Sequence, residues 1–265
     1  MSTIQAGVLN LYKRHGETPR ETIERFKSRH PEYADTKMTY AGRLDPMAEG
    51  VLLVVCGKEI ENKEKYLDLD KEYIFEAVFG IQTDTYDILG VPSWKLAIDD
   101  WELKSKNFHG EKLIINEIDK MKGKRMQLYP PYSSKTVLGR KLFNWAKEGK
   151  LNEIDIPEIE IEIYNLELTG LRSIHKKEFE EFVNESISKV KGDFRQDEIA
   201  ESWKTFFENC KRSEFVVFTF RTVCSRGTYV RSIVHELGIK LQIGAVTLHI
   251  KRTRVGNHVI HSSLT

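Results

Sequence analysis

Alternating apolar and polar residues predict several β-strands in this chain. The strictest two-residue period lies at residues 158–163, where isoleucines alternate with glutamates, so one face is expected to be buried and the other exposed. Residues 72–79 alternate in a similar way and place Tyr73 on an inward face, as a core aromatic or as a base-stacking surface. Residues 215–224 form a further predicted strand, and the apolar run at 51–55 is typical of a buried one.

Helical patterns lie between these strands without any fixed repeat, which argues against a solenoid or a propeller. Thr18 and Glu21 form a capping box with proline at the first helical position, and this predicts a helix that ends near His30. Apolar residues recur at helical spacing over 230–241. This second helix is expected to break or end near Gly238.

The composition is that of a soluble globular protein. The 265 residues are 40% hydrophobic and 31% charged, enough for one large domain or a domain with an appendage. No apolar run is long enough to cross a bilayer and no cleavable leader is present, so a cytoplasmic location is expected. Three cysteines, odd in number and far apart, predict neither a disulfide framework nor a metal site.

Charge is spread unevenly, although the formal net charge is only +1. Residues 153–201 contain 14 acidic and six basic side chains, whereas residues 221–258 contain seven Lys or Arg and a single acid, Glu236. A polyanion would therefore be held by the C-terminal segment. Residues 173–211 are polar and acidic with apolar positions at helical spacing, which predicts a helical insertion between two strands. The pattern suggests no function for this insertion.

The most informative local motif surrounds Asp45. Gly42 and Gly50 permit backbone angles and close approaches that a side chain would block, while Pro46 stiffens the residue after the acid. A rigid strand after this loop suits a catalytic acid, but an ordinary Asp-Pro turn fits the local pattern equally well. Arg231, in the first turn of its helix, also has two interpretations. A solvated or phosphate-contacting side chain is slightly favoured over a guanidinium paired with a carboxylate.

Five ordered motifs together resemble the TruB family of tRNA pseudouridine synthases. They extend over nearly the whole chain apart from the acidic insertion, and their shared order is far more specific than any single motif. The motifs lie at residues 6–18, 40–52, 71–90, 127–149 and 227–256.

The resemblance implies an α+β fold with a mixed, largely antiparallel sheet flanked by helices. It implies one catalytic domain over residues 1–265, with the insertion at 173–211, and no C-terminal PUA domain. The implied reaction is isomerisation of a T-loop uridine of tRNA to pseudouridine, without a cofactor or metal. In this family pattern Asp45 is the catalytic aspartate, Tyr73 stacks on the target base, and Arg231 pairs with the acid.

Twelve further residues are candidates for binding the RNA. The target nucleotide must be flipped out, and basic side chains would then grip the flanking phosphates. Tyr40 stands where the family often carries histidine, so an aromatic wedge would displace loop bases in a different way. The candidates are Lys13, Tyr40, Gly42, Arg43, Lys71, Tyr132, Lys135, Arg226, Tyr229, Lys251, Arg252 and Arg254.

Several alternatives stay open on the sequence alone. Asp45 either attacks the ribose carbon or abstracts a ribose proton. The target is a T-loop uridine, a different uridine or another RNA. A catalytically silent RNA-binding or RNA-folding protein is a separate hypothesis, although Asp45, Tyr73 and Arg231 are all present. A general structural module explains the motifs least well, and neither protein partners nor the oligomeric state is predicted.

Overall fold

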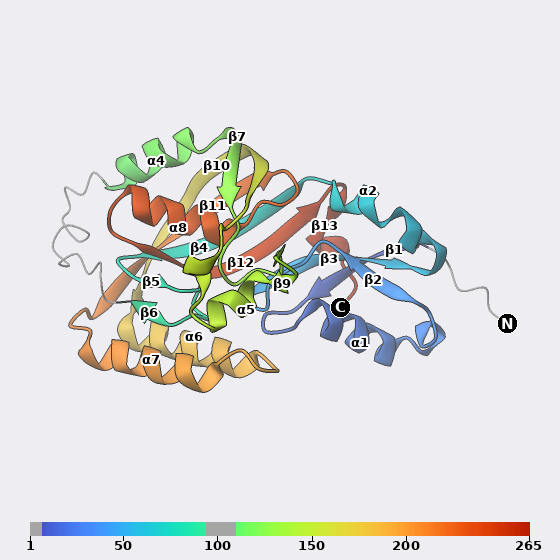
Figure 1. Cartoon of the computed structure of the whole chain (residues 1–265), viewed down its shortest axis with the longest axis horizontal. Helices are drawn as coiled ribbons and strands as arrows, with labels where there is room; N and C mark the ends of the chain where they lie inside the picture. Colours follow the sequence, from blue (N-terminus) through green and yellow to red (C-terminus); the bar gives the residue numbers. More distant parts are fainter. Residues whose placement is uncertain (1–6, 94–109) are drawn as a thin grey trace.

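A mixed β-sheet forms the centre of the protein, whose computed structural model describes residues 7–93 and 110–265. Ala6 of the first motif lies outside the described residues. Within them, nine strands make up this sheet: β1 (Gly7–Lys13), β2 (Met38–Ala41), β3 (Ala48–Cys56), β4 (Lys71–Phe79), β7 (Gly123–Leu128), β10 (Glu158–His175), β11 (Glu214–Cys224), β12 (Ala245–Val255) and β13 (His258–Val259). Their order is β1-β3-β12-β4-β11-β10-β7, with β2 beside β3 and β13 beside β12 (Figure 1). Only the pairing of β12 with β3 is parallel.

Helices and short hairpins surround this sheet. The α-helices are α1 (Pro19–Arg29), α2 (Lys63–Leu67), α4 (Gly110–Lys120), α5 (Leu142–Lys147), α6 (Lys176–Lys189), α7 (Gln196–Asn209) and α8 (Val230–Lys240). The hairpins pair β5 (Gln82–Thr83) with β6 (Pro92–Ser93), and β8 (Thr136–Val137) with β9 (Arg140–Lys141). No helix of the described ranges is long and apolar enough to cross a membrane.

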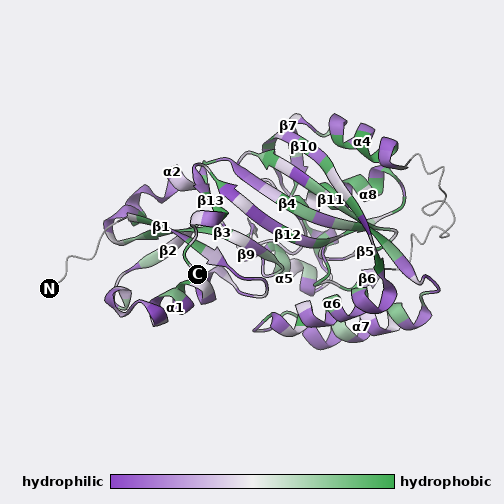
Figure 2. Cartoon of the chain, turned by 180° about the vertical axis from the view of Figure 1, so that it is seen from behind, coloured by the Kyte–Doolittle hydropathy of each residue, from purple (hydrophilic) through white to green (hydrophobic). Residues whose placement is uncertain are grey.

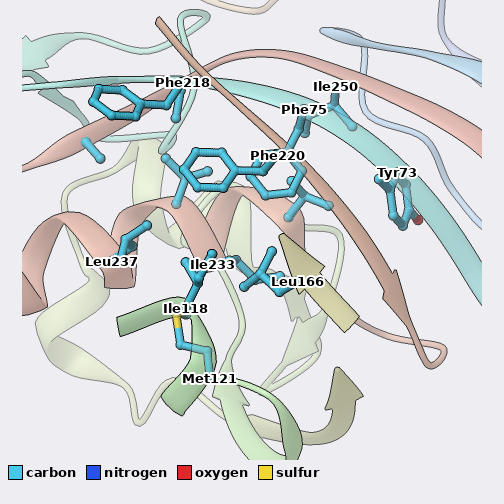
Figure 3. Close-up of a cluster of buried hydrophobic side chains, with 14 of the residues drawn as sticks. Tyr73, Phe75, Ile118, Met121, Leu166, Phe218, Phe220, Ile233, Leu237 and Ile250 are labelled. Carbon is cyan, nitrogen blue, oxygen red and sulfur yellow. The ribbon is translucent and has the colours of Figure 1, made fainter. Parts of the chain in front are cut away.

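The two faces of the sheet carry separate hydrophobic clusters. α4 and α8 pack on one face, where Phe75 stacks on Phe220 with ring centroids 5.2 Å apart (Figure 3). α6 and α7 pack on the other face, against side chains such as Val78 and Val217. Alternate residues of β4 and β11 thus face opposite clusters, which is why both strands are buried along most of their length. α6 and α7 contain many hydrophilic residues (Figure 2), while their apolar side chains pack into the cluster on this face.

Most local patterns predict their elements well. Thr18 caps α1 with both hydrogen bonds of the capping box, and His30 ends the helix. β4 buries Tyr73 as expected. β10 is much longer than the predicted strand, because its pairing with β11 continues from Ile163 to His175 although the strict alternation stops.

The last helix ends within two residues of Gly238, as predicted, although Gly238 itself is still helical. α8 continues through Gly238 to Lys240. A Cβ at Gly238 would lie 2.3 Å from the backbone nitrogen of Ala245, so the glycine allows α8 to press against β12. Its role is close packing rather than termination of the helix.

Candidate active site

Asp45 lies in the loop between β2 and β3, and its side chain is 33% exposed. The Asp45 carbonyl accepts a hydrogen bond from the nitrogen of Ala48 at 3.0 Å, which closes a turn leading directly into β3. Gly42 and Gly50 have φ angles of +87° and +108°. A Cβ on Gly50 would lie 2.2 Å from the carbonyl oxygen of Arg252, so glycine lets β3 run close beside β12. The motif is therefore a tight turn that also holds an acid just before the start of β3.

Lys13 fastens this loop from within the protein. Its side chain is completely buried, and Nζ donates hydrogen bonds to the carbonyls of Ala48 at 2.5 Å and Pro46 at 3.3 Å. Burial lowers the pKa of Lys13 to about 7, although the charge of Asp45 acts in the opposite direction. The prediction that Lys13 contacts RNA is wrong, because its ammonium group has no exposed surface. It supports the backbone that carries the acid instead.

Arg231 is the counter-ion of Asp45. It lies in the first turn of α8, is only 3% exposed, and donates from Nε to Asp45 Oδ2 at 2.7 Å. Nη1 donates to the carbonyl of Thr85 at 2.6 Å, and Nη2 to that of Tyr132 at 3.4 Å. Burial acts to lower the pKa of Arg231, but the charges of Asp45 and Asp87 outweigh it and raise the pKa. The solvated interpretation is therefore wrong, and the expected ion pair is present.

Asp87 is a second carboxylate of this site that the sequence did not single out. Its Oδ2 lies 3.5 Å from Arg231 Nε, and its side chain is only 6% exposed. Oδ1 accepts hydrogen bonds from Thr85 Oγ1 at 2.8 Å and from the nitrogen of Leu89 at 2.9 Å. Burial raises the pKa of Asp87 to about 6, against the opposing charge of Arg231. Its only sequence signal is its position in the motif at 71–90.

Tyr73 joins the core to the site. It lies at one end of the cluster that contains the stacked phenylalanines, and only 8% of it is exposed (Figure 3). It also lines the same cleft as Asp45. Burial raises the pKa of its hydroxyl. The tyrosine is thus a core aromatic that is also accessible from the cleft.

One cleft of about 840 Å³ brings most of the predicted site residues together. This volume can enclose a group the size of a nucleotide. Its walls come from the β2–β3 loop, the start of β4, the segment before α5, the start of α8, and the turn between α6 and α7. The predicted residues that line it are Tyr40, Gly42, Arg43, Asp45, Lys71, Tyr73, Tyr132, Arg226, Tyr229, Arg231 and Arg252.

Two of these basic side chains donate hydrogen bonds to backbone carbonyls instead of pointing their charges into solvent. Arg252 is 1% exposed and donates from Nε to the Val51 carbonyl at 2.7 Å and from Nη1 to that of Arg43 at 3.0 Å. Lys71 Nζ donates to the Leu67 carbonyl at 2.6 Å, and burial lowers the pKa of Lys71 to about 8. Arg252 therefore shapes the Asp45 loop. The expectation that it grips an outer phosphate is not supported by its burial.

Aromatic and basic side chains occupy the more open parts of the cleft. The Tyr40 ring centre lies 6.0 Å from Arg43 Cζ and 5.6 Å from Lys63 Nζ. Tyr229, by contrast, is partly buried in the cleft wall, and this burial raises the pKa of its hydroxyl to about 12. Arg226 is ion-paired with Asp68 at the rim.

Lys135, Lys251 and Arg254 are not among the lining residues. Lys135 Nζ lies 4.9 Å from the ring centre of Tyr129, a residue of the cleft wall, so it flanks the opening. Lys251 Nζ lies 3.4 Å from Glu49 Oε1, and Arg254 Nη2 lies 3.8 Å from Glu72 Oε2 on β4. In the described part of the chain, no three His, Cys, Asp or Glu side chains are grouped so that they could hold a metal ion.

The chain is similar to known proteins over most of its length. A model described as the N-terminal domain of TruB family pseudouridylate synthases matches residues 30–186, more than half of the chain. The chain belongs to the TruB family. tRNA pseudouridine synthase B of Caldanaerobacter subterraneus is 30% identical over 261 residues, which cover 98% of this chain and 72% of that protein. The protein of the same name from Thermosipho melanesiensis is 29% identical over 259 residues, covering 97% of this chain and 66% of that protein.

The chain also shares its fold with proteins of two solved structures. The chain superposes on a protein of a Cbf5–Nop10–Gar1 complex with a TM-score of 0.54 and 20% identity, covering 96% of this chain and 50% of that one. A protein of an H/ACA RNP bound to a substrate RNA containing 2′-deoxyuridine gives a TM-score of 0.51 and 19% identity, with 96% and 48% covered. The predicted α+β fold with a mixed, largely antiparallel sheet is confirmed. The chain spans about two thirds of the length of the relatives in sequence and about half of these structures.

Proposed function

We propose that this chain isomerises a uridine of tRNA to pseudouridine and that the target lies in the T-loop. The observation that carries the proposal is the partly exposed carboxylate of Asp45, held at 2.7 Å by the buried guanidinium of Arg231 inside a nucleotide-sized cleft. Membership of the TruB family and the name shared by its relatives, tRNA pseudouridine synthase B, support this reaction. A cytoplasmic location, where tRNA is found, is part of the same proposal.

The chemistry requires a carboxylate, an enclosed base and a route for one proton. The bond between uracil N1 and ribose C1′ breaks, the base turns, and a bond forms between C5 and C1′. The proton on C5 is lost and N1 gains a proton, so the product is an isomer with no redox change. Asp45 starts this sequence either by attacking C1′ or by abstracting a ribose proton. Both routes need an ionised carboxylate beside the ribose.

The neighbours of Asp45 supply the remaining requirements. Arg231 fixes the direction of the carboxylate, because its other two nitrogens are bound to backbone carbonyls and cannot follow the acid if it moves. Tyr73 lies in the cleft wall, where its ring can stack on uracil and retain the detached base. Asp87 balances the charge of Arg231 from the buried side. The base reaches this site only when it is flipped out of its stack.

The test uses a T-arm stem-loop labelled with tritium at uracil C5. We expect the wild type to release label, and Asp45→Ala to lower the rate at least about 10³-fold because the reacting carboxylate is gone. Asp119→Ala is the matched control, since this carboxylate on α4 has a 57% exposed side chain paired with a neighbouring lysine. It should release label like the wild type.

Three outcomes separate the hypotheses. Equal release by wild type and Asp45→Ala would refute the role of Asp45. Release from whole tRNA but not from the stem-loop would move the target to a different uridine, which mapping of the modified position would identify. No release from any tRNA, with binding intact, would favour a catalytically silent RNA-binding protein.

A further inference from the structure

The α6–α7 hairpin is a firmly packed part of the fold. It leaves the sheet at the end of β10 and returns at the start of β11, and its helices lie side by side against the sheet (Figure 1). Phe179 of α6 and Trp203 of α7 are completely buried in the cluster between the hairpin and the sheet. Trp203 Nε1 also donates to the carbonyl of Ile88 at 3.0 Å, in the segment that carries Asp87. The hairpin is therefore anchored to the same segment that supports the site.

The turn between the two helices reaches the cleft itself. Asp193, Phe194 and Arg195 line the same cavity as Asp45. Gln196 organises this turn: Nε2 donates to the carbonyls of Val190 at 3.1 Å and Gly192 at 2.6 Å, and Oε1 accepts from the nitrogen of Phe194 at 2.9 Å. The turn has a defined shape before any ligand arrives, which reduces the entropy lost on binding.

Two tethers fix the turn to the opposite side of the cleft opening. Arg195 Cζ lies 4.4 Å from the ring centre of Tyr132, and its Nη2 lies 2.9 Å from Asp84 Oδ2. Lys147 Nζ donates to both the carbonyl and the carboxylate of Asp193 at 3.0 Å. The one acid of the turn is thus neutralised, so the acidity of the two helices does not extend to the cleft wall.

Phe194 is a large apolar side chain that this turn leaves partly exposed. It is 38% exposed, whereas the other phenylalanines of the hairpin pack into the cluster under it. Its ring lies over Gly192, where a Cβ would be 3.6 Å from a ring carbon, and its other surroundings belong to the cleft. A rigidly mounted aromatic ring beside an arginine is the arrangement on which unpaired bases stack.

We propose that Phe194 is a base-stacking platform for an unpaired nucleotide next to the flipped uridine, and that Arg195 positions the turn that presents it. This inference rests on the proposed function, since it assigns the hairpin a share in holding the same RNA. It gives the acidic insertion a role at its tip, while its charged outer faces stay away from the phosphates.

The test compares Phe194→Ala, Phe194→Tyr and Leu171→Ala. Leu171 on β10 is 41% exposed and does not line the cleft, so it controls for loss of an exposed apolar side chain. Binding of a fluorescein-labelled T-arm stem-loop is followed by anisotropy, and KM and kcat by tritium release. Stacking on a protein aromatic is worth roughly 5- to 150-fold in affinity. We expect Phe194→Ala to raise Kd and KM about tenfold with kcat within about twofold, and the other two variants to match the wild type.

Each result decides one question. Unchanged Kd and KM in Phe194→Ala would overturn the platform, and so would a fall in melting temperature and kcat at constant KM, which marks a structural residue. If the wild type binds the stem-loop without releasing tritium, the proposed function fails, while the Kd comparison still decides whether Phe194 contacts RNA. If the wild type binds no stem-loop, both fail.

Discussion

The floor of the cleft and the tip of the α6–α7 hairpin use charge in different ways. At the floor, Lys13, Arg231 and Arg252 are 0%, 3% and 1% exposed, and each bonds to backbone carbonyls. At the tip, Phe194 is 38% exposed, and the Arg195 side chain lies over an aromatic ring with 16% of its surface open. Buried cations cannot reorient without losing hydrogen bonds, so the floor fixes geometry. The tip offers exposed surface, so on our proposal it contributes affinity for RNA.

The largest effect that separates these regions is expected for Arg231→Lys. Lysine keeps the charge but cannot bind Asp45 and the carbonyls of Thr85 and Tyr132 in one plane. We expect kcat to fall about 10²-fold, as for the loss of one well-placed donor in an active site, while Kd for the stem-loop stays within about threefold. Single-turnover kinetics and anisotropy measure the two quantities. A large loss of affinity with unchanged turnover of bound RNA would identify Arg231 as a phosphate contact. The floor and the tip of the hairpin would then no longer differ in function.

A smaller effect, on stability, is expected for Lys13→Met. The change leaves buried carbonyls of the Asp45 loop without a donor, so the free energy of unfolding at pH 7 should fall by about 1–3 kcal/mol. Because burial lowers the pKa of Lys13 from its ordinary value of 10.5 to about 7, folding releases a proton between these pH values. Wild-type stability therefore gains with rising pH through this window, and the gain is complete near the unfolded value.

Urea unfolding of both proteins at pH 7 and pH 10 checks this sign. The stability difference between wild type and Lys13→Met should be larger at pH 10. A difference that shrinks with pH would mean that the ammonium form is stabilised at this position, and that the floor tolerates a charged lysine without cost.

The smallest effect is expected for Lys135→Ala at the cleft opening. Its ammonium lies 4.9 Å from the Tyr129 ring centre, outside the cleft lining, so we expect it to attract RNA only at long range. We expect Kd to rise about two- to threefold at low salt, with a slope of log Kd against log salt that changes by less than about 1. Lys204→Ala, whose side chain on α7 is 59% exposed and far from the cleft lining, is the matched control. A tenfold loss at high salt would place Lys135 in direct contact instead.

Sequence patterns predicted the elements more securely than the roles of single side chains. The capping box located α1, and the Gly-bounded motif located the turn before β3. The long extension of β10 was missed because its pairing with β11, rather than its own alternation, holds it as a strand. α8 continues through Gly238, and the neighbouring strand β12 lies so close that only a residue without a Cβ fits there.

The sequence identified some site residues correctly and misjudged the surroundings of others. Asp45, Tyr73 and Arg231 follow from the family resemblance, and the structure places all three in one cleft. Lys13 and Arg252 are basic residues of the kind that contact RNA, yet both are buried. Their burial was not predicted, because the local sequence does not show which backbone carbonyls need a buried donor.

The sequence did not predict Asp87 or Phe194 as site residues, because each one reaches the site only through contacts with residues that are distant in sequence. Asp87 lies 3.5 Å from Arg231, and the distance between these two residues in the sequence does not predict this ion pair. The hairpin turn meets the wall formed by Tyr132 and Lys147 only after the two helices pack on the sheet.

By itself the sequence located several strands and helices and the chemistry available at Asp45, because alternation, capping and glycine act over a few residues. Tertiary structure alone decided which charges are buried, which carboxylates share Arg231, and that an acidic insertion places an aromatic ring at the mouth of the cleft. These outcomes depend on packing between segments more than 100 residues apart, as the bonds from Arg231 to Asp45 and from Trp203 to Ile88 illustrate. Burial then sets the energy of each charge, and no local pattern encodes that environment.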